Sequence, residues 1–354
     1  MALSLPRAPL FASGATTNPF ANLAVEEWLL RAHAARALRS ERPSLYVWRN
    51  SPCVVIGAHQ NAYAECAIGA MAKDDVTLVR RHTGGGAVYH DLGNTNWTFV
   101  GAKRNFSRER NFGVVVRALR GLGVDGATVT GRNDITTGDG RKVSGSAFRE
   151  TGAASLHHGT VLVNADLTAL QRYLTPNPLK LASKGVASAR ARVANLAEIN
   201  KKARHEELCD ALTAEFRKEY GIDASVKVLS LDAVDFCRRV PEASAFYDQL
   251  NTMEWTLGQN PPFATRFETR FSWGIVDLRM DVKNGVIENV VAFSDTLVPE
   301  FVDELCSTLK GVGFTGRAIN GALRLKAAGC LNADATSQLL ELMDWLCPQI
   351  PDSN

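Results

Sequence analysis

The feature that most constrains this chain is a run of three glycines, Gly84–Gly86, between two apolar segments. The flanking residues, 76–79 and 87–89, have the short apolar composition of buried strands. Three successive glycines are entropically costly to order, so in a chain interior they indicate a tight connection whose bare backbone is approached closely. A plain hairpin turn is the simplest alternative. The full string RRHTGGGAVYHDLGNTNW, with arginines before the glycines and short polar residues after them, favours a loop that binds a ligand with an apolar part and a negative group.

Composition excludes several classes of protein. A length of 354 residues accommodates one large domain and a smaller one. The net charge of +3 is too small to indicate nucleic-acid binding, and no apolar run approaches the length of a membrane span. The seven cysteines are odd in number and form no C-x-x-C pair, which argues against a disulfide framework or a zinc site. The P-loop pattern G-x-x-x-x-G-K-[ST] is also absent.

The first two thirds of the chain alternate short apolar runs with amphipathic segments. Residues 176–192 are rich in Pro, Lys, Ser and Arg, which is typical of a long loop with a function or without order. The periodicities predict helices over 22–37, 111–122 and 205–220, strands over 45–48, 53–56, 96–100 and 160–163, and a hairpin that joins 131–134 to 142–147.

A second domain is predicted beyond a proline-bearing linker. Gly258 and the pair Pro261–Pro262 indicate a linker over 256–265, so that residues 1–255 form one domain and residues 266–354 another. The turn signal Lys283–Asn284–Gly285 predicts a β-hairpin. Three helices are expected after it, over 299–309, 316–328 and 333–346. These elements predict a smaller α/β accessory domain.

Lys142 is the clearest candidate for chemistry. It lies close in sequence to Ser144, Gly145 and Ser146, and the expected strand ends bring it near Asp134 and the three glycines. A single ammonium among small side chains can hold a phosphate oxygen and a carboxylate together. On local sequence alone, a lysine that faces solvent is the alternative.

The string RR-x-x-GGG-x-V-x-HD-x-GN-x-N resembles the signature of lipoate–protein ligases and their lipoyltransferase relatives. The resemblance continues in order through GRND at 131–134, KVSGSA at 142–147, HHGT at 157–160 and KG-x-x-S at 184–188, and so covers residues 20–196. It implies an α+β catalytic domain of the type shared by biotin and lipoate ligases and class II synthetases. The G-R-G-R-x-G string of biotin ligases is missing, which argues against biotin.

The same resemblance implies roles for individual residues. Lys142 matches the catalytic lysine, which contacts the acyl-adenylate at its mixed anhydride. Asp134 is also expected to hold Mg²⁺, with a turn residue as the alternative, and stabilisation of a helix terminus is the alternative for Glu26. The residues expected to bind lipoate or the adenylate are Glu26, Arg81, Thr83, Gly84, Gly85, Gly86, Tyr89, His90, Asn94, Asn133, Asp134, His158, Gly159, Thr160 and Lys184. We expect His157 to be structural.

Some lipoyl-transferring relatives use a nucleophilic cysteine. Cys53 and Cys66 are the only cysteines in the N-terminal part that carries the motifs, and Cys53 lies in a run typical of a buried strand. A buried thiol is a poor nucleophile, so the sequence disfavours thioester catalysis.

The activity implied by the resemblance is that of a ligase with two steps. Lipoate is activated by ATP in the presence of Mg²⁺ to lipoyl-AMP, and the lipoyl group then passes to a lysine of a lipoyl domain, without a tightly bound prosthetic group. The expected acceptors are acyltransferase subunits of 2-oxoacid dehydrogenases and the glycine-cleavage H protein. A lipoyltransferase that uses preformed lipoyl-nucleotide is the nearby alternative, and a non-catalytic lipoate-binding protein is the remote one. We expect a monomer that binds neither nucleic acid nor membrane, in mitochondria if the chain is eukaryotic, with the cytoplasm as the alternative.

Overall fold

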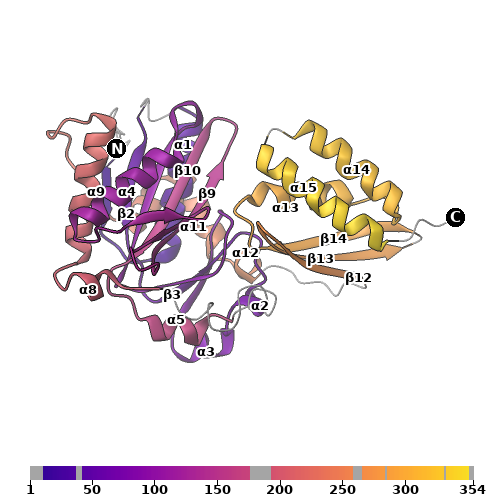
Figure 1. Cartoon of the computed structure of the whole chain (residues 1–354), viewed down its shortest axis with the longest axis horizontal. Coiled ribbons are helices and arrows are strands. Elements are labelled where there is room, and N and C mark those ends of the chain that lie inside the picture. The colour runs from indigo at the N-terminus through magenta and orange to yellow at the C-terminus, as the bar shows by residue number, and fades with distance from the viewer. Residues whose placement is uncertain are drawn as a thin grey trace.

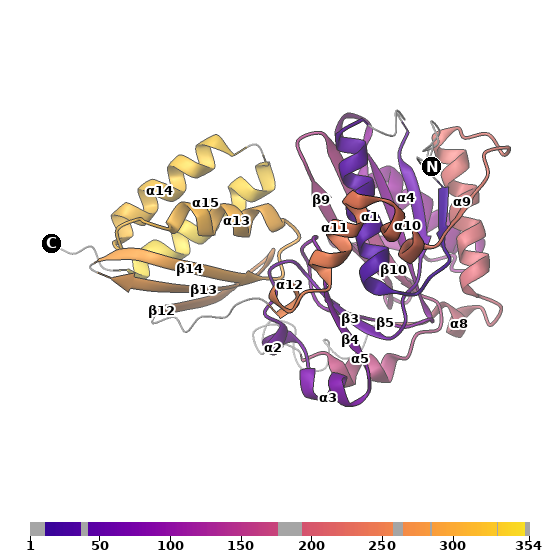
Figure 2. The same cartoon turned by 180° about the vertical axis from the view of Figure 1, so that it is seen from behind.

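The structure is a computed structural model of the chain, and it describes residues 11–36, 42–175, 193–257, 265–283, 285–330 and 332–350. A larger part made from the N-terminal two thirds lies beside a smaller part made from the C-terminal third (Figures 1 and 2). Within those ranges, no helix combines the length and the apolar character needed to cross a membrane.

The larger part is built on a mixed eight-stranded sheet. Its order is β11-β1-β2-β6-β10-β9-β8-β7, in which β1 runs parallel to β2 and β11 and the other neighbours are antiparallel. The predicted hairpin is confirmed as the pair β8 and β9. The strands are β1 (Phe11–Gly14), β2 (Ser44–Trp48), β6 (Asn94–Ala102), β7 (Thr128–Thr130), β8 (Asp134–Thr136), β9 (Lys142–Glu150), β10 (Ala154–Leu162) and β11 (Leu229–Leu231).

Helices cover both faces of this sheet (Figures 1 and 2). On one face α4 (Arg108–Gly121) and α9 (His205–Tyr220) pack their apolar stripes into a core that includes Phe99 and Phe216. On the other face α1 (Pro19–Ala34), α10 (Ala233–Arg239) and α11 (Pro241–Leu250) form a second core. Shorter helices complete this part: α2 (Ala62–Glu65), α3 (Ile68–Lys73), α5 (Leu167–Tyr173) and α8 (Leu196–Ile199).

The first helix starts three residues earlier than the sequence predicted. The side chain of Asn18 accepts a hydrogen bond from the backbone N–H of Ala21 at 3.0 Å, and Pro19 occupies the first helical position. An asparagine cap followed by proline is a strong start signal, because proline lacks the N–H that a first turn leaves unpaired. Asn22, the predicted start, is instead a fully buried side chain inside the helix.

The three glycines cross a second, smaller sheet. This sheet has the order β4-β3-β5, with β3 (Cys53–Ile56) between β4 (Thr77–Arg80) and β5 (Val88–His90). β3 runs parallel to β4 and antiparallel to β5, so the strands on either side of the glycines are not paired with each other. The connection is therefore a loop across the end of β3, and the hairpin alternative is excluded.

The C-terminal part is a three-stranded antiparallel sheet covered on one face by three helices (Figure 1). The strands are β12 (Thr265–Phe271), β13 (Gly274–Lys283) and β14 (Val286–Ser294), and the helices are α13 (Pro299–Leu309), α14 (Gly316–Gly329) and α15 (Ala333–Leu346). The predicted β-hairpin and the three predicted helices are confirmed. In the predicted linker, α12 (Met253–Leu257) already includes Thr256 and Leu257, and residues 258–264 lie outside the described residues. The domain boundaries at 255 and 266 stay predictions.

The smaller part contacts the triglycine loop directly. The backbone N–H of Gly85 donates to the carbonyl oxygen of Thr296 at 2.7 Å, just beyond β14. A Cβ atom on Gly84 would lie 2.1 Å from the same oxygen, so only glycine permits this approach. Two further hydrogen bonds join the parts: the backbone N–H of Ser294 donates to His59 O at 2.7 Å, and the side-chain Nη2 of Arg132 donates to Trp273 O at 2.8 Å.

We therefore predict that Gly84→Ala separates the two parts. The added methyl overlaps a backbone atom that cannot move independently of its sheet, and overpacking of this kind costs about 1–3 kcal/mol. Small-angle scattering should show a larger radius of gyration, and the melting temperature should fall. Gly86→Ala is the matched control, because a Cβ there meets no described atom within 4 Å. Identical scattering and melting of Gly84→Ala and the parent would contradict the prediction.

His157 on β10 is enclosed by aromatic rings, as expected of a structural residue. Its ring centroid lies 4.4 Å from that of Phe148, 4.7 Å from Phe112 and 4.8 Å from Trp97. Neither ring nitrogen has a hydrogen-bond partner within the described ranges. Burial lowers the pKa of His157 well below its usual value of 6.5, so the folded protein holds this ring neutral.

This burial predicts a contribution to acid sensitivity. Below pH 6.5 the unfolded chain protonates His157 and the folded chain does not, so stability is lost as pH falls below that value. The loss from one such group is about 1.4 kcal/mol per pH unit. His157→Phe should therefore flatten the fall in the free energy of unfolding between pH 6 and pH 5, measured by urea denaturation, by about that amount. An unchanged slope would show that His157 does not stay neutral in the fold.

Candidate active site

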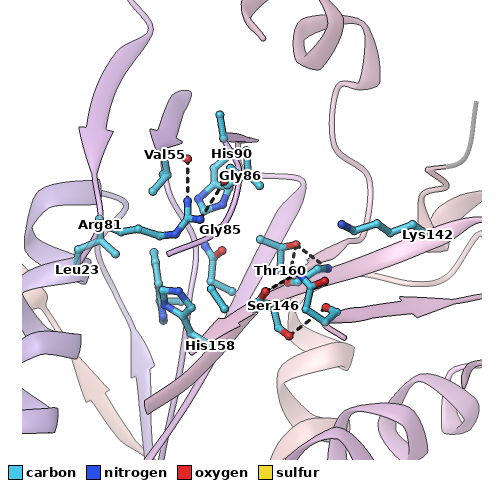
Figure 3. A pocket seen from close by; sticks show the side chains of 18 residues that line it. Leu23, Val55, Arg81, Gly85, Gly86, His90, Lys142, Ser146, His158 and Thr160 are labelled. Carbon is cyan, nitrogen blue, oxygen red and sulfur yellow. Dashed lines mark hydrogen bonds between the residues drawn. The ribbon is translucent and has the colours of Figure 1, made fainter. Parts of the chain in front are cut away.

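A cavity of about 150 Å³ lies between the triglycine loop and strands β9 and β10 (Figure 3). Its two sides differ in chemistry. Lys142, Ser146 and Thr160 lie on one side of the view, and Leu23, Arg81, Val55 and His90 lie on the other. The full lining consists of Leu23, Trp48, Val55, Arg81, Gly85, Gly86, Ala87, Val88, His90, Asn96, Asn133, Lys142, Gly145, Ser146, Ala147, His158, Gly159 and Thr160. The cavity therefore has a polar end at Lys142 and a largely apolar end near Val55.

Arg81 holds the triglycine loop in place from inside the fold. Its guanidinium donates to the carbonyl oxygens of Val55 at 3.0 Å, Gly84 at 2.6 Å and Gly86 at 2.9 Å. Burial lowers the pKa of Arg81 to about 10, so the side chain is still a cation at neutral pH. The preceding Arg80 points elsewhere and donates to the backbone of α12, at Trp255 and Thr256. The sequence predicted Arg81 as the arginine that binds the ligand, and Arg81 lines the cavity while Arg80 does not.

Glu26, His158 and Thr83 form a buried relay behind the loop. The Nδ1 atom of His158 lies 3.0 Å from both carboxylate oxygens of Glu26, and its Nε2 atom lies 2.9 Å from Thr83 Oγ1. A carboxylate only accepts, so Nδ1 carries a proton. Thr83 Oγ1 in turn accepts from Arg81 Nε at 2.9 Å. The relay links helix α1, strand β10 and the loop, and it presents the His158 ring to the cavity. Glu26 thus has a positioning role, and it lies inside α1 and not in its first turn.

Lys142 is placed at the polar end by small neighbours. Its ammonium lies 2.8 Å from Asp134 Oδ1, and both side chains are about one-third exposed. A Cβ atom on Gly145 would lie 2.8 Å from Lys142 Nζ, so glycine leaves room for the ammonium. The prediction that Asp134 and Lys142 meet at neighbouring strand ends is confirmed. The alternative of a lysine in open solvent is excluded, because Lys142 lines the cavity.

The remaining polar contacts come from the hairpin and β10. Asn133 Nδ2 donates to the carbonyl of Ser146 at 2.8 Å, and Ser146 Oγ donates to the carbonyl of Asn133 at 3.0 Å. Thr160 Oγ1 lies 3.4 Å from the backbone N and O of Gly145. A Cβ atom on Gly159 would lie 2.4 Å from the Trp97 ring, so only glycine fits at this position of β10. These contacts fix the positions of the polar groups at this end of the cavity.

Most of the predicted site residues gather here. The cavity is lined by Arg81, Gly85, Gly86, His90, Asn133, Lys142, His158, Gly159 and Thr160. Glu26, Thr83 and Asp134 contact lining residues from behind, and Asn94 Nδ2 donates to Asn96 Oδ1 at 3.1 Å. Gly84 faces the C-terminal part and not the cavity. Lys184 lies outside the described residues.

Tyr89 requires a correction. Successive side chains of a strand alternate between its faces, so Val88 and His90 share the cavity side and Tyr89 takes the other. Its ring packs 5.7 Å from that of Tyr173, in a cluster with α3 and α5. Tyr89 therefore supports the small sheet from its far side.

Sequence reasoning did not assign the apolar lining of Leu23, Trp48, Val55 and Val88 to the site. These side chains come from α1, β2, β3 and β5 and carry no polar motif of their own. The sequence feature that could have revealed them is the alternation of side chains along β5, which places Val88 on the same face as His90. Asn96 also lines the cavity, at two residues from the predicted Asn94.

The cysteines offer no nucleophile to this cavity. Neither Cys53 nor Cys66 lines it, and burial raises the pKa of each thiol to about 12. At neutral pH both are protonated and unreactive. The structure thus agrees with the prediction against thioester catalysis.

Comparison with known proteins identifies this architecture. Residues 18–217 match the lipoyl protein ligase A/B catalytic domain, and residues 260–346 match the bacterial lipoate protein ligase C-terminus. Lipoate-protein ligase A of Psychrobacter cryohalolentis is 43% identical over 337 residues, which span 94% of this chain and 96% of that protein. Among solved structures, P. falciparum LipL1 in complex with lipoate has a TM-score of 0.83 and 32% identity, covering 96% of this chain and 99% of that chain.

Two further solved structures match nearly three quarters of this chain. A lipoate-protein ligase A bound with ATP has a TM-score of 0.57 and 28% identity, covering 72% of this chain and 98% of that one. A bipartite lipoate protein ligase from Thermoplasma acidophilum, described with its E2 lipoyl domain, has a TM-score of 0.59 and 29% identity, covering 73% and 99%. From the two matched domains and the identity over nearly its whole length, this chain belongs to the lipoate–protein ligase A family.

Proposed function

We propose that this chain is an ATP-dependent lipoate–protein ligase that forms lipoyl-AMP and transfers the lipoyl group to a lysine of an acceptor protein. One observation carries the proposal: the Lys142 ammonium stands at the polar end of a cavity whose other end is largely apolar. This matches an amphipathic acid whose carboxylate must react while its chain is buried. Relatives of this chain have been crystallised with lipoate and with ATP.

In the first step a carboxylate oxygen of lipoate attacks the α-phosphorus of ATP. The new O–P bond forms as the bond to pyrophosphate breaks, which gives lipoyl-AMP and pyrophosphate. Negative charge concentrates on the α-phosphate oxygens in the transition state, and a preorganised cation stabilises it there. Lys142 supplies this cation, because its compact ammonium fits beside Gly145 and Ser146 where a planar guanidinium would not.

Magnesium would accompany ATP as part of the substrate. Within the described residues, no three His, Cys, Asp or Glu side chains are grouped to hold a metal ion. Mg²⁺ is commonly bound by one or two carboxylates together with phosphate oxygens and water, so a single carboxylate at the polar end is a sufficient protein ligand. Asp134 is that carboxylate, and in this structure it contacts Lys142. When bound, the ion would neutralise charge on the phosphates.

In the second step the ε-amine of the acceptor lysine attacks the acyl carbon of lipoyl-AMP. The C–N bond forms, the bond between the acyl carbon and the phosphate oxygen breaks, AMP leaves with the electron pair of that bond, and the amine loses a proton. Lys142 holds the anhydride for this attack as well. We propose that the acceptors are lipoyl domains of 2-oxoacid dehydrogenase acyltransferase subunits and the glycine-cleavage H protein. The archaeal relative described with its E2 lipoyl domain supports the first of these. The compartment stays a prediction.

A lipoyltransferase that uses only preformed lipoyl-nucleotide is the alternative. Lipoate-dependent exchange of pyrophosphate into ATP, run beside transfer from synthetic lipoyl-AMP, separates the two. Exchange and transfer together support the ligase. Transfer without exchange would replace it with the lipoyltransferase, and neither would leave only a binding protein.

Lys142→Ala should abolish chemistry without unfolding the protein. The lysine is about one-third exposed and buries little apolar surface, so the melting temperature should stay near that of the parent. Loss of one preorganised electrostatic contact lowers the rate roughly 10²- to 10³-fold, and we expect this in both pyrophosphate exchange and transfer from lipoyl-AMP.

Lys103→Ala provides the matched control. Lys103 lies in the same part of the fold and pairs with Glu150 at 2.9 Å, but it is not among the residues that line the cavity. Its removal should leave both half-reactions near the parent rates. If Lys142→Ala still adenylates lipoate within a few-fold of the parent, Lys142 is not the catalytic cation.

A further inference from the structure

His90 lines the cavity and has one ring nitrogen without a hydrogen-bond partner among the described residues. The side chain is buried, and that nitrogen is Nε2. Burial, with the nearby charge of Arg81, lowers the pKa of His90 to about 3, so the ring is neutral at any physiological pH. A neutral imidazole is a donor at one nitrogen and an acceptor at the other. The structure therefore has to show which ring nitrogen of His90 carries the proton.

A chain of buried amide side chains determines which nitrogen of His90 carries the proton. Asn22 Nδ2 lies 3.1 Å from the carbonyl oxygen of Arg49 and 3.3 Å from that of Thr16, so this atom is the amide nitrogen. The opposite atom, Asn22 Oδ1, accepts from the hydroxyl of Tyr46 at 2.7 Å. Burial raises the pKa of Tyr46 well above its usual value, which keeps that hydroxyl protonated. The orientation of the Asn22 amide is thus determined from both sides.

The orientation passes along the chain to His90. Asn22 Nδ2 donates to Asn50 Oδ1 at 3.0 Å, so the other end of the Asn50 amide is its NH₂ group. That NH₂ group lies 3.2 Å from His90 Nδ1 and 3.6 Å from Cys53 Sγ. His90 Nδ1 must then accept, and the proton of the neutral ring sits on Nε2. Asn50 makes His90 a neutral N–H donor at the nitrogen that has no protein partner.

The position of His90 says which part of a ligand it meets. Its ring lies 6.4 Å from that of Trp48, and it stands with Val55 on the side of the cavity away from Lys142 (Figure 3). If the carboxylate is activated at Lys142, as the proposed function requires, the far end of the acid lies near His90. In lipoate that end is a dithiolane with two sulfur atoms, and in octanoate it is a methyl group.

We propose that Asn50, by fixing the tautomer of His90, makes this cavity select acids with a hydrogen-bond acceptor at the distal end, so that lipoate is favoured over octanoate. The inference rests on the proposed function and goes beyond it in naming what sets the choice of acid. A sulfur of the dithiolane disulfide is a weak acceptor, as the thioether sulfur of methionine is, and it pairs the Nε2–H that an alkyl chain would leave unpaired. Asn50 is a positioning residue, and His90 is the contact.

The test compares lipoate with octanoate in the same pyrophosphate-exchange assay. For His90→Phe, which keeps a flat ring but removes the donor, the ratio of kcat/KM for lipoate to that for octanoate should fall roughly 2- to 10-fold, the range of one hydrogen bond. The fall should come from a higher KM for lipoate, with kcat nearly unchanged. Asn50→Asp should act in the same direction, because a carboxylate accepts from Nδ1–H and moves the proton away from Nε2. His157→Phe is the control, since it makes the same change at another buried histidine that does not line the cavity, and its ratio should equal that of the parent.

The tautomer itself is measured by ¹⁵N NMR of histidine-labelled parent protein. We expect the Nε2–H form of His90 in the parent and the Nδ1–H form in Asn50→Asp. The NMR result on the parent stands even if Asn50→Asp does not fold, and His90→Phe then carries the kinetic arm. An Nδ1–H tautomer in the parent, or an unchanged lipoate-to-octanoate ratio in a folded and active His90→Phe, would overturn the inference. Absence of exchange with either acid in the parent would instead overturn the proposed function.

Discussion

The buried guanidinium of Arg81 is the interaction on which the site depends. A buried cation is stable only when its donors are satisfied, and here they are satisfied by carbonyl oxygens of the triglycine loop and of Val55 on β3. The glycines make this possible, because a side chain at Gly84 would collide with the backbone of Thr296 in the C-terminal part, and one at Gly85 would crowd the guanidinium of Arg81 itself. The interactions of Arg81 therefore determine the conformation of the loop. The loop in turn forms one wall of the cavity and contacts the C-terminal part.

Two adjacent arginines at the end of strand β4 have different roles: Arg80 is its last residue and Arg81 follows it. Arg81 turns to the loop, and Arg80 turns to the backbone of α12, at the beginning of the connection to the C-terminal part. Trp255 on α12 returns a hydrogen bond to the carbonyl of Arg80 at 2.9 Å. The attachment of the C-terminal part and the wall of the cavity are therefore linked through Arg80 and Arg81, which are adjacent in sequence.

The sequence predicted the elements better than it predicted which side chains share a face. Glycine runs, turn signals and apolar periodicity are local, so the loop, the β8–β9 hairpin and the C-terminal helices were accessible. Lys142 was also found, although local sequence alone favours a lysine that faces solvent, because the expected strand ends bring it near Asp134 and the glycines and because the family resemblance assigns it the catalytic role. The placement of Tyr89 failed although strand alternation assigns it to the far face. Asn50 could not be found, since its meaning depends on Asn22 and His90, which lie 28 and 40 residues away in the chain.

The two ends of the cavity place different electrostatic requirements on the side chains that line them. At the polar end a cation is needed, and the ammonium of Lys142 lies there, partly exposed and 2.8 Å from Asp134 Oδ1. At the apolar end a charged histidine would be costly beside Arg81, and burial together with that arginine keeps His90 neutral. A neutral ring can still donate one hydrogen bond without demanding a counter-ion. The cavity can therefore hold an acid that is anionic at one end and uncharged at the other, with the anionic end beside the Lys142 ammonium and the uncharged end beside the neutral ring of His90.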